Sequence, residues 1–165
     1  MNAPVPKQTP APREAGRPPG MRRRPLEILM VEDHPGDVRL AVEALKESEV
    51  ENRLNVARDG EEGLAFLRRE GRFADAPRPD LVLLDLNLTR KDGRELLADI
   101  KMDSRLRGLP VIVLTTSSAD EDIQRSYDLH ANCYIVKPAG LDEQFRVMRS
   151  IVEFWFSVAA LPPMP

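Results

Sequence analysis

The sequence predicts an α/β protein built around one parallel β-sheet with helices on both faces. Five short apolar segments alternate with five segments whose apolar residues recur at helical spacing, between residue 26 and about residue 160. Segments 81–86 and 110–115 are apolar at nearly every position, as expected of strands buried on both faces. Turn residues separate the segments, so each strand leads into a helix.

The first two units are read from strand, turn and helix signals in order. Residues 26–31 (LEILMV) form an apolar strand, and the stretch His34-Pro35-Gly36-Asp37 begins a helix that ends near residue 48. Residues 53–57 form a shorter, partly polar strand. After a turn at 58–60, residues 61–70 continue as a second helix.

The remaining units repeat this alternation with stronger signals. They are strands at 81–86, 110–115 and 133–136 and helices at 94–102, 120–129 and 141–160. Asp92 and Gly93 mark the turn before the first of these helices. Because crossovers between parallel strands are right-handed, we predict a doubly wound, flavodoxin-like sheet with the strand order 2-1-3-4-5.

Composition divides the 165-residue chain into a leader, one domain and a short tail. Seven of the 15 prolines and a net charge of +5 fall within residues 1–25, which have too few apolar residues for a core. We predict a disordered Pro- and Arg-rich leader there, which is either a basic tether for an acidic partner or membrane surface, or a segment without a role. Residues 26–161 are predicted to form one domain, followed by a tail at 162–165.

The predicted domain is acidic, which argues against nucleic-acid binding by its surface. The whole chain has a net charge of -3, so the residues after the basic leader carry about -8. A single cysteine, Cys133, cannot form an internal disulfide. The chain has no secretory signal and no apolar run near the roughly 18 residues of a membrane span. We predict a cytoplasmic protein that binds neither nucleic acid nor membrane.

Polar side chains of complementary chemistry occur where the predicted strands end. They are Glu32 and Asp33 after the first strand, Asp85 in the third, Thr115 in the fourth and Lys137 after the fifth. Because ligands of an open α/β sheet bind at the carboxyl ends of its strands, we expect these groups to converge. Crowded carboxylates require a cation, and oxygen ligands beside a phosphate suit Mg²⁺. One carboxylate could then attack phosphorus, while the ammonium and hydroxyl stabilise the transferring group.

This motif set resembles the receiver domain of two-component response regulators over about residues 26–160. The resemblance rests on the Glu32-Asp33 pair, Asp85 in LVLLDLNL, Thr115 in PVIVLTT and Lys137 in YIVKP. The intervals of 30 residues from Asp85 to Thr115 and 52 residues to Lys137 also match. The resemblance implies a stand-alone response regulator that accepts a phosphoryl group from a histidine kinase onto Asp85. It would then switch a protein–protein interaction surface or relay the phosphate.

The resemblance also implies the metal site. Asp33, Asp85 and the backbone carbonyl of Asn87 would bind Mg²⁺, and Glu32 would act through water. Thr89 departs from the family pattern, because many receivers have a proline at this position.

Further roles follow from the same resemblance. Lys137 would pair with the phosphate, while Thr115 and Tyr134 would form the switch that responds to it. The bond between Lys137 and Pro138 would be cis. Asn87 and Ser117 lie where receivers tune the attack of hydrolytic water, and neither is a strong base, so self-dephosphorylation would be slow. The protein would be a phosphoacceptor and not an enzyme, apart from this reaction and Mg²⁺-dependent self-phosphorylation from small donors.

The segments ILMVEDHPGDVRL and DLNLTRKDGRELL, with extra length near residues 68–79, resemble the subgroup paired with phytochrome-type histidine kinases. The predicted last helix carries two apolar stripes, of which a single sheet needs only one. We therefore predict a homodimer through the face formed by the fourth helix, fifth strand and fifth helix. Kinase docking on this face, or packing of the second stripe against the chain's own loops, are the alternatives.

Two other functions compete with phosphoacceptance. A haloacid-dehalogenase-type phosphatase also uses a strand-end aspartate and Mg²⁺, but it needs a second acid where this chain has Asn87. A pseudo-receiver would bind partners without phosphorylation, but it would not need the complete set of Asp85, Thr115 and Lys137.

Overall fold

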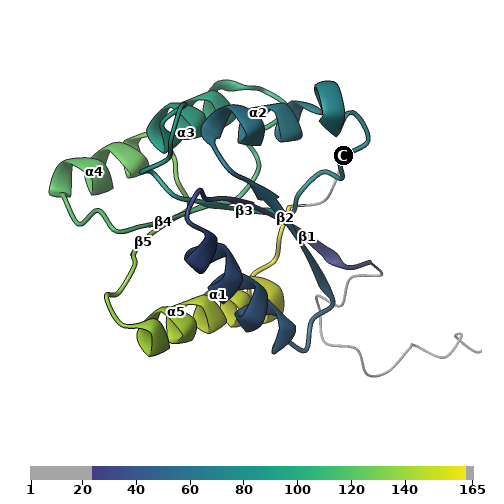
Figure 1. Cartoon of the computed structure of the whole chain (residues 1–165). Helices are drawn as coiled ribbons and strands as arrows, with labels where there is room; N and C mark the ends of the chain where they lie inside the picture. The colour runs from purple at the N-terminus through teal and green to yellow at the C-terminus, as the bar shows by residue number, and fades with distance from the viewer. Residues whose placement is uncertain (1–23, 163–165) are drawn as a thin grey trace, which may run out of the picture.

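The computed structural model describes residues 24–162 and contains a five-stranded parallel sheet between two layers of helices (Figure 1). The strands are β1 (Leu26–Val31), β2 (Asn52–Ala57), β3 (Leu81–Leu84), β4 (Val111–Thr115) and β5 (Cys133–Val136). Their order is β2-β1-β3-β4-β5, which confirms the predicted doubly wound, flavodoxin-like topology.

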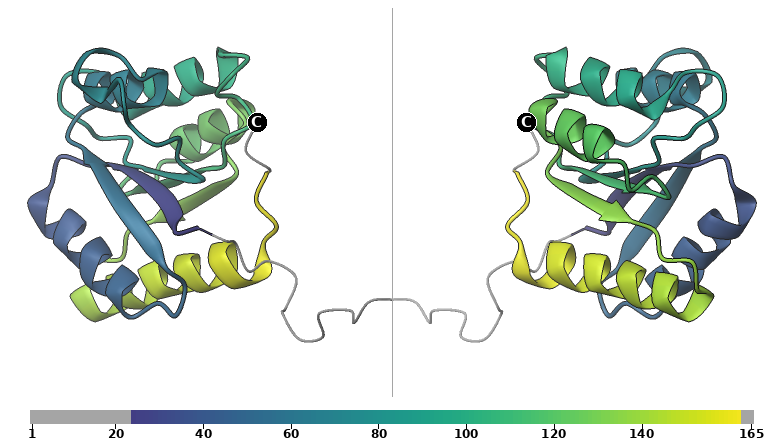
Figure 2. Two further views of the ribbon diagram at one scale, coloured as in Figure 1. Left: turned by 90° about the vertical axis from the view of Figure 1, so that its right-hand side faces the viewer. Right: turned by 90° about the vertical axis from the view of Figure 1, so that its left-hand side faces the viewer.

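Five α-helices alternate with the strands. They are α1 (Pro35–Lys46), α2 (Gly60–Arg68), α3 (Gly93–Met102), α4 (Asp120–Asp128) and α5 (Leu141–Glu153). Helices α1 and α5 cover one face of the sheet, and α2, α3 and α4 cover the other (Figure 1). The right-hand view of Figure 2 faces the sheet edge formed by β5, with α4 above it and α5 below.

The central strand β1 shows why the sheet has two cores. It pairs with β2 on one side and β3 on the other, and all six of its residues are buried. Because alternate side chains point to opposite faces, Leu29 and Val31 join the core under α2 and α3. Ile28 and Met30 join the core under α1 and α5.

Two acidic side chains fix where helices begin at the carboxyl end of the sheet. The Asp59 carboxylate accepts a hydrogen bond from the Glu62 amide at 2.8 Å and caps α2. The Asp92 carboxylate accepts one from the Arg94 amide at 2.6 Å and caps α3. Strand β3 ends at Leu84, before the predicted end at 86, because the chain leaves the sheet at Asp85.

The end of the last helix differs from the predicted range 141–160. Helix α5 ends at Glu153, and the chain continues as a π-helical turn, η2 (Phe154–Val158). A π-helical turn holds an extra residue and rotates the side chains that follow it. Trp155 is half-buried against the core under α1 and α5, whereas the Phe154 side chain remains 52% exposed.

The predicted leader at 1–25 lies outside the described residues except for Arg24 and Pro25, as does most of the predicted tail at 162–165. The Arg24 guanidinium forms an ion pair with the buried Asp80 carboxylate at 2.7 Å, which attaches the start of the described chain to β3. Among residues 24–162, no helix is long and apolar enough to cross a membrane.

Candidate functional site

The ends of four strands bring the predicted chemical groups together at one edge of the sheet. Glu32 directly follows β1, Asp85 follows β3, Thr115 is the last residue of β4 and Lys137 follows β5. The pairing of these parallel strands in register places their carboxyl ends side by side. The convergence expected from the sequence is therefore present for these four side chains.

Lys137 lies at the centre of this arrangement. Its ammonium contacts carboxylate oxygens of Glu32 at 2.6 Å, Asp37 at 2.6 Å and Asp85 at 2.7 Å. The Lys137 side chain is only 6% exposed, so these contacts are shielded from solvent. Three carboxylates around one ammonium leave an excess of two negative charges, which a divalent cation would neutralise.

Burial and hydrogen bonding act in opposite directions on the two carboxylates that are most shielded. Burial raises the pKa of Glu32 above its usual range, although the ammonium of Lys137 opposes this. Burial also acts to raise the pKa of Asp85, but hydrogen bonds from Lys137, Asn87 and Thr115 outweigh it and hold this pKa below its usual value. Asp85 is therefore ionised at neutral pH, as a nucleophile must be.

Asp37 was not predicted to belong to the site. It lies in the first turn of α1, where an acidic residue is usually explained by the helix dipole. Its position four residues after Asp33 was the available signal, because a residue in that turn stays close to the strand ends. Its carboxylate forms an ion pair with the Lys137 ammonium at 2.6 Å.

Asp33 does not join the carboxylates that surround Lys137. The three described acidic groups whose oxygens lie within 4.8 Å of one another are Glu32, Asp37 and Asp85. The Asp33 carboxylate instead accepts a hydrogen bond from the backbone N–H of Thr89 at 3.0 Å. Asp33 therefore contacts the loop between β3 and α3, beside the cluster rather than within it.

Asn87 connects the acidic cluster to the end of β4. Its backbone N–H donates to Asp85 at 2.9 Å, and its side-chain amide donates to the hydroxyls of Thr115 at 3.2 Å and Thr116 at 3.4 Å. Within residues 24–162, no hydrogen bond ends on the Asn87 carbonyl oxygen. This carbonyl is thus available as a ligand, as the resemblance implied.

These donors fit a hard divalent cation. Carboxylates and a backbone carbonyl are oxygen ligands, which Mg²⁺ prefers, and the excess negative charge favours binding. Asp33, Asp85 and the Asn87 carbonyl would hold the ion, with Glu32 acting through water. The ammonium of Lys137 already bonds to Oδ2 of Asp85, so this carboxylate would serve both Lys137 and the divalent cation.

The predicted switch residues lie in a hydrogen-bonded network around α4. The Tyr134 hydroxyl donates to the Ser117 carbonyl oxygen at 3.1 Å, and the Ser117 hydroxyl donates to Asp122 at 2.6 Å. Asp122 also accepts two hydrogen bonds from Arg94 of α3, at 2.7 and 2.5 Å, and these hydrogen bonds lower its pKa to about 2. The segment that follows Thr115 is therefore fixed to both α3 and β5.

The predicted cis bond between Lys137 and Pro138 is wrong, since the described residues contain no cis peptide bond. The trans form is the more stable one for most X–Pro bonds, by about 0.5–1 kcal/mol. The Lys137 amide donates to the Thr115 carbonyl oxygen at 2.7 Å, and the Lys137 side chain reaches all three carboxylates from this backbone.

Comparison with known sequences identifies one family. The family model of the response regulator receiver domain matches residues 28–149. Response regulator Rcp1 of Synechocystis sp. is 46% identical over 138 residues, which cover 84% of this chain and 94% of Rcp1. The probable methanogenesis regulatory protein FilR2 of Methanothrix harundinacea is 41% identical over 132 residues, which cover 79% of this chain and 84% of FilR2.

Solved structures show the same relationship. The Mn²⁺-bound form of response regulator Rcp1 superposes with a TM-score of 0.83 at 46% identity, covering 84% of this chain and 100% of that one. The phosphorylated cyanobacterial phytochrome response regulator RcpA superposes with a TM-score of 0.83 at 52% identity, covering 85% of this chain and 100% of that one.

Proposed function

The chain belongs to the response regulator receiver family, and we propose that Asp85 accepts its phosphoryl group from a histidine kinase in a Mg²⁺-dependent reaction. The observation that carries this proposal is the buried Asp85 carboxylate, kept ionised by Lys137 among three converging acids. The Mn²⁺-bound form of Rcp1 supports a divalent cation in this reaction, because a protein 46% identical to this chain binds one. The likeness to RcpA, a phytochrome response regulator, supports a kinase of the phytochrome type.

Each residue of the site has its own role in the phosphoryl transfer. A carboxylate oxygen of Asp85 attacks phosphorus, the P–N bond to the kinase histidine breaks, and the imidazole leaves with that electron pair. Lys137 and the Thr115 hydroxyl, which both hydrogen-bond to Asp85, stabilise charge on the phosphoryl oxygens. When bound, Mg²⁺ would neutralise the remaining negative charge of the acids and the phosphoryl group. The product is an acyl phosphate on Asp85.

We further propose that this phosphate is hydrolysed slowly and is read out through Tyr134. The Asn87 side-chain amide is bonded to two threonine hydroxyls and offers no base to activate water. Once Thr115 bonds to the phosphate, its contact with Asn87 is released, which frees the segment that Tyr134 contacts through Ser117. Phosphorylation thus adds negative charge at Asp85 and shifts the segment after Thr115 between two arrangements.

Replacing Asp85 by asparagine is expected to abolish phosphoryl uptake. The wild-type protein, incubated with acetyl phosphate and Mg²⁺, should gain the mass of one phosphoryl group, measured on the intact protein. Asp85→Asn should gain none, because an amide cannot form the acyl phosphate. Asp128→Asn, which removes an exposed carboxylate of α4, is the matched control and should behave like the wild-type protein.

This experiment also distinguishes the alternative functions. A wild-type protein that gains no phosphoryl group would support the pseudo-receiver, which binds partners without phosphorylation. Continuous release of inorganic phosphate without an accumulating adduct would support the phosphatase. Asn87 occupies the position where the phosphatase requires its second acid, which weighs against that alternative.

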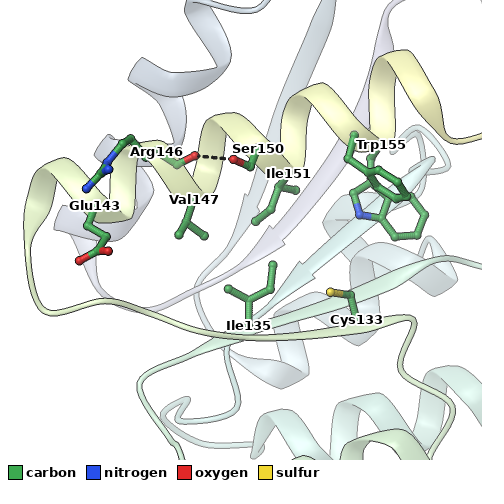
Figure 3. A pocket seen from close by; sticks show the side chains of 9 residues that line it. Cys133, Ile135, Glu143, Arg146, Val147, Ser150, Ile151 and Trp155 are labelled. Carbon is green, nitrogen blue, oxygen red and sulfur yellow. Dashed lines mark hydrogen bonds between the residues drawn. The ribbon is translucent and has the colours of Figure 1, made fainter.

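The face formed by α4, β5 and α5 is the proposed homodimer interface. Five of the seven large apolar side chains that are exposed among residues 24–162 belong to these elements or to the turn that follows α5, namely Tyr127, Val136, Leu141, Phe154 and Val158. A groove of about 450 Å³ runs between the open edge of β5 and α5, where Ile135, Val147 and Trp155 line it (Figure 3). Concentrated apolar exposure of this kind marks an interaction surface.

The chain itself covers only part of the second apolar stripe of the last helix, which supports a partner. This stripe comprises Val147, Ile151, Phe154, Val158 and Leu161. Ile151 is buried, but Phe154 and Val158 remain 52% and 70% exposed. In a two-fold interface the same patch meets itself, so one apolar face per subunit is sufficient. Docking of the kinase on this face is the alternative occupant.

Phe154→Asp is expected to shift the protein from dimer to monomer, because it places a charge in the proposed interface. Sedimentation velocity over a range of protein concentrations measures the change. Met102→Asp introduces the same charge on α3, where the side chain is 83% exposed, and should leave association unchanged. An identical concentration dependence for wild type and both variants would contradict the dimer and leave kinase docking as the use of this face.

A further inference from the structure

A backbone amide in the loop between β3 and α3 contacts one of the proposed metal ligands. The N–H of Thr89 donates a hydrogen bond to Oδ2 of Asp33 at 3.0 Å. Within residues 24–162, no other hydrogen bond or ion pair reaches the Asp33 carboxylate. The direction of this carboxylate therefore depends on the loop amide.

The residue type at position 89 decides whether this bond can exist. Many receivers have proline here, and proline has no backbone N–H to donate. Threonine supplies the donor, and its exposed side chain makes no hydrogen bond within the described chain. The departure from the family pattern thus adds a contact to Asp33 through the main chain alone.

The loop is held in place by contacts that do not involve Asp33. Arg90 adopts a left-handed backbone conformation with φ of 61°, and its guanidinium lies 3.5 Å from Asp59 at the start of α2. Gly60 lets the Lys91 carbonyl approach, since a Cβ atom there would lie 2.4 Å from that oxygen. The Thr89 amide is therefore presented by a loop that packs against the start of α2 through contacts other than the one to Asp33.

We propose that Thr89 is a positioning residue whose N–H orients Asp33 toward the divalent cation of the phosphorylation site. With Oδ2 bonded to the amide, Oδ1 remains available as the ligand. Ligating carboxylates are commonly held by such outer hydrogen bonds, and their loss typically costs 10- to 100-fold in metal affinity. This inference rests on the proposed function, because it requires the metal site that the function uses.

The test compares two substitutions that differ in the N–H group. Thr89→Pro removes the donor, whereas Thr89→Ala removes only the side chain. Calorimetric titration with Mn²⁺ should show an affinity loss of at least about 10-fold for Thr89→Pro and less than about 2-fold for Thr89→Ala. In an Asp33→Asn background, Thr89→Pro should cause no further loss. Far-UV circular dichroism and thermal unfolding in EDTA establish that each variant is folded.

Hydrogen exchange tests the same bond without changing the backbone. The Thr89 amide should be protected from exchange in the wild-type protein and should lose that protection in Asp33→Ala. This measurement decides the matter even if Thr89→Pro fails to fold. Equal protection in both proteins would overturn the inference.

Different results would contradict the proposed function and the role of Thr89. If the wild-type protein neither binds Mn²⁺ nor takes up a phosphoryl group, the proposed function is wrong. If the wild-type protein does both and Thr89→Pro binds Mn²⁺ as tightly as Thr89→Ala, the function stands and the role of Thr89 is wrong.

Discussion

Replacing Gly93 by alanine is expected to lower the free energy of unfolding by about 3 kcal/mol or more, which places it among the most damaging single substitutions in this chain. A Cβ atom at this position would lie 2.1 Å from the carbonyl oxygen of Asp85 and 2.6 Å from the Cα atom of Leu86. Both are main-chain atoms, so no side-chain rotation can relieve the overlap. The start of α3 would have to move away from Asp85, with loss of the hydrogen bond from the Gly93 amide to Leu86.

Urea denaturation followed by far-UV circular dichroism measures this effect. Gly108→Ala is the matched control, because a Cβ atom at Gly108 meets nothing within 4 Å and its change should stay within about 0.5 kcal/mol of the wild type. A Gly93→Ala protein within about 1 kcal/mol of the wild type would show that the loop before α3 yields easily. In that case the position of Asp85 would not depend on this close approach.

The second large effect is expected for Lys137→Met, which removes the ammonium and keeps most of the side-chain volume. Glu32, Asp37 and Asp85 would then face one another without the cation that now bonds to all three. Removing one partner of a buried ion pair typically costs about 3–5 kcal/mol, and a loss of this order is expected at pH 7 in EDTA. Chemical denaturation measures it.

Two conditions should reduce the loss of stability in Lys137→Met. Added Mg²⁺ would neutralise the same carboxylates. Lower pH would also help, because repulsion among the clustered carboxylates makes proton binding more favourable in the folded variant than in the unfolded chain. The variant should therefore approach the wild type in stability as the pH falls from 7 toward 5.

Lys101→Met is the matched control for this experiment. It also removes a half-buried ammonium, but one that donates to the neutral oxygens of Leu109 and Asn132, at 2.8 and 3.1 Å. Its loss leaves no uncompensated carboxylate, so its stability should respond to neither Mg²⁺ nor lower pH in this way. Equal responses in Lys101→Met and Lys137→Met would show that the acidic cluster does not require Lys137.

The sequence predicts most of the fold because three of its five strands are nearly continuous apolar runs. Strands β1, β3 and β4 are buried along their whole length, so their apolar runs need no reference to the rest of the chain. Strand β2 lies at the sheet edge and is partly exposed, which explains its weaker pattern. The π-helical turn after α5 was not predicted, because its apolar spacing differs little from that of an α-helix.

The site residues that lie at strand ends were predicted from the sequence, whereas other features of the site were not. Glu32, Asp85, Thr115 and Lys137 were predicted because each lies at a strand end. Asp37 was missed because it lies in the first turn of α1 and not at a strand end, where an acidic residue is usually explained by the helix dipole. The direction of Asp33 was not predicted either, since a threonine in place of proline shows that a backbone N–H is present but not which group accepts its hydrogen bond.

The contacts of Lys137 also bear on the order in which the protein is made. On the ribosome, Glu32, Asp37 and Asp85 emerge 105, 100 and 52 residues before the lysine that neutralises them. A nascent chain that has already paired its first four strands therefore carries three mutually repelling acids at their carboxyl ends. Only addition of the final strand supplies the missing ammonium, so completion of the sheet and completion of the reactive centre are the same event in biosynthesis.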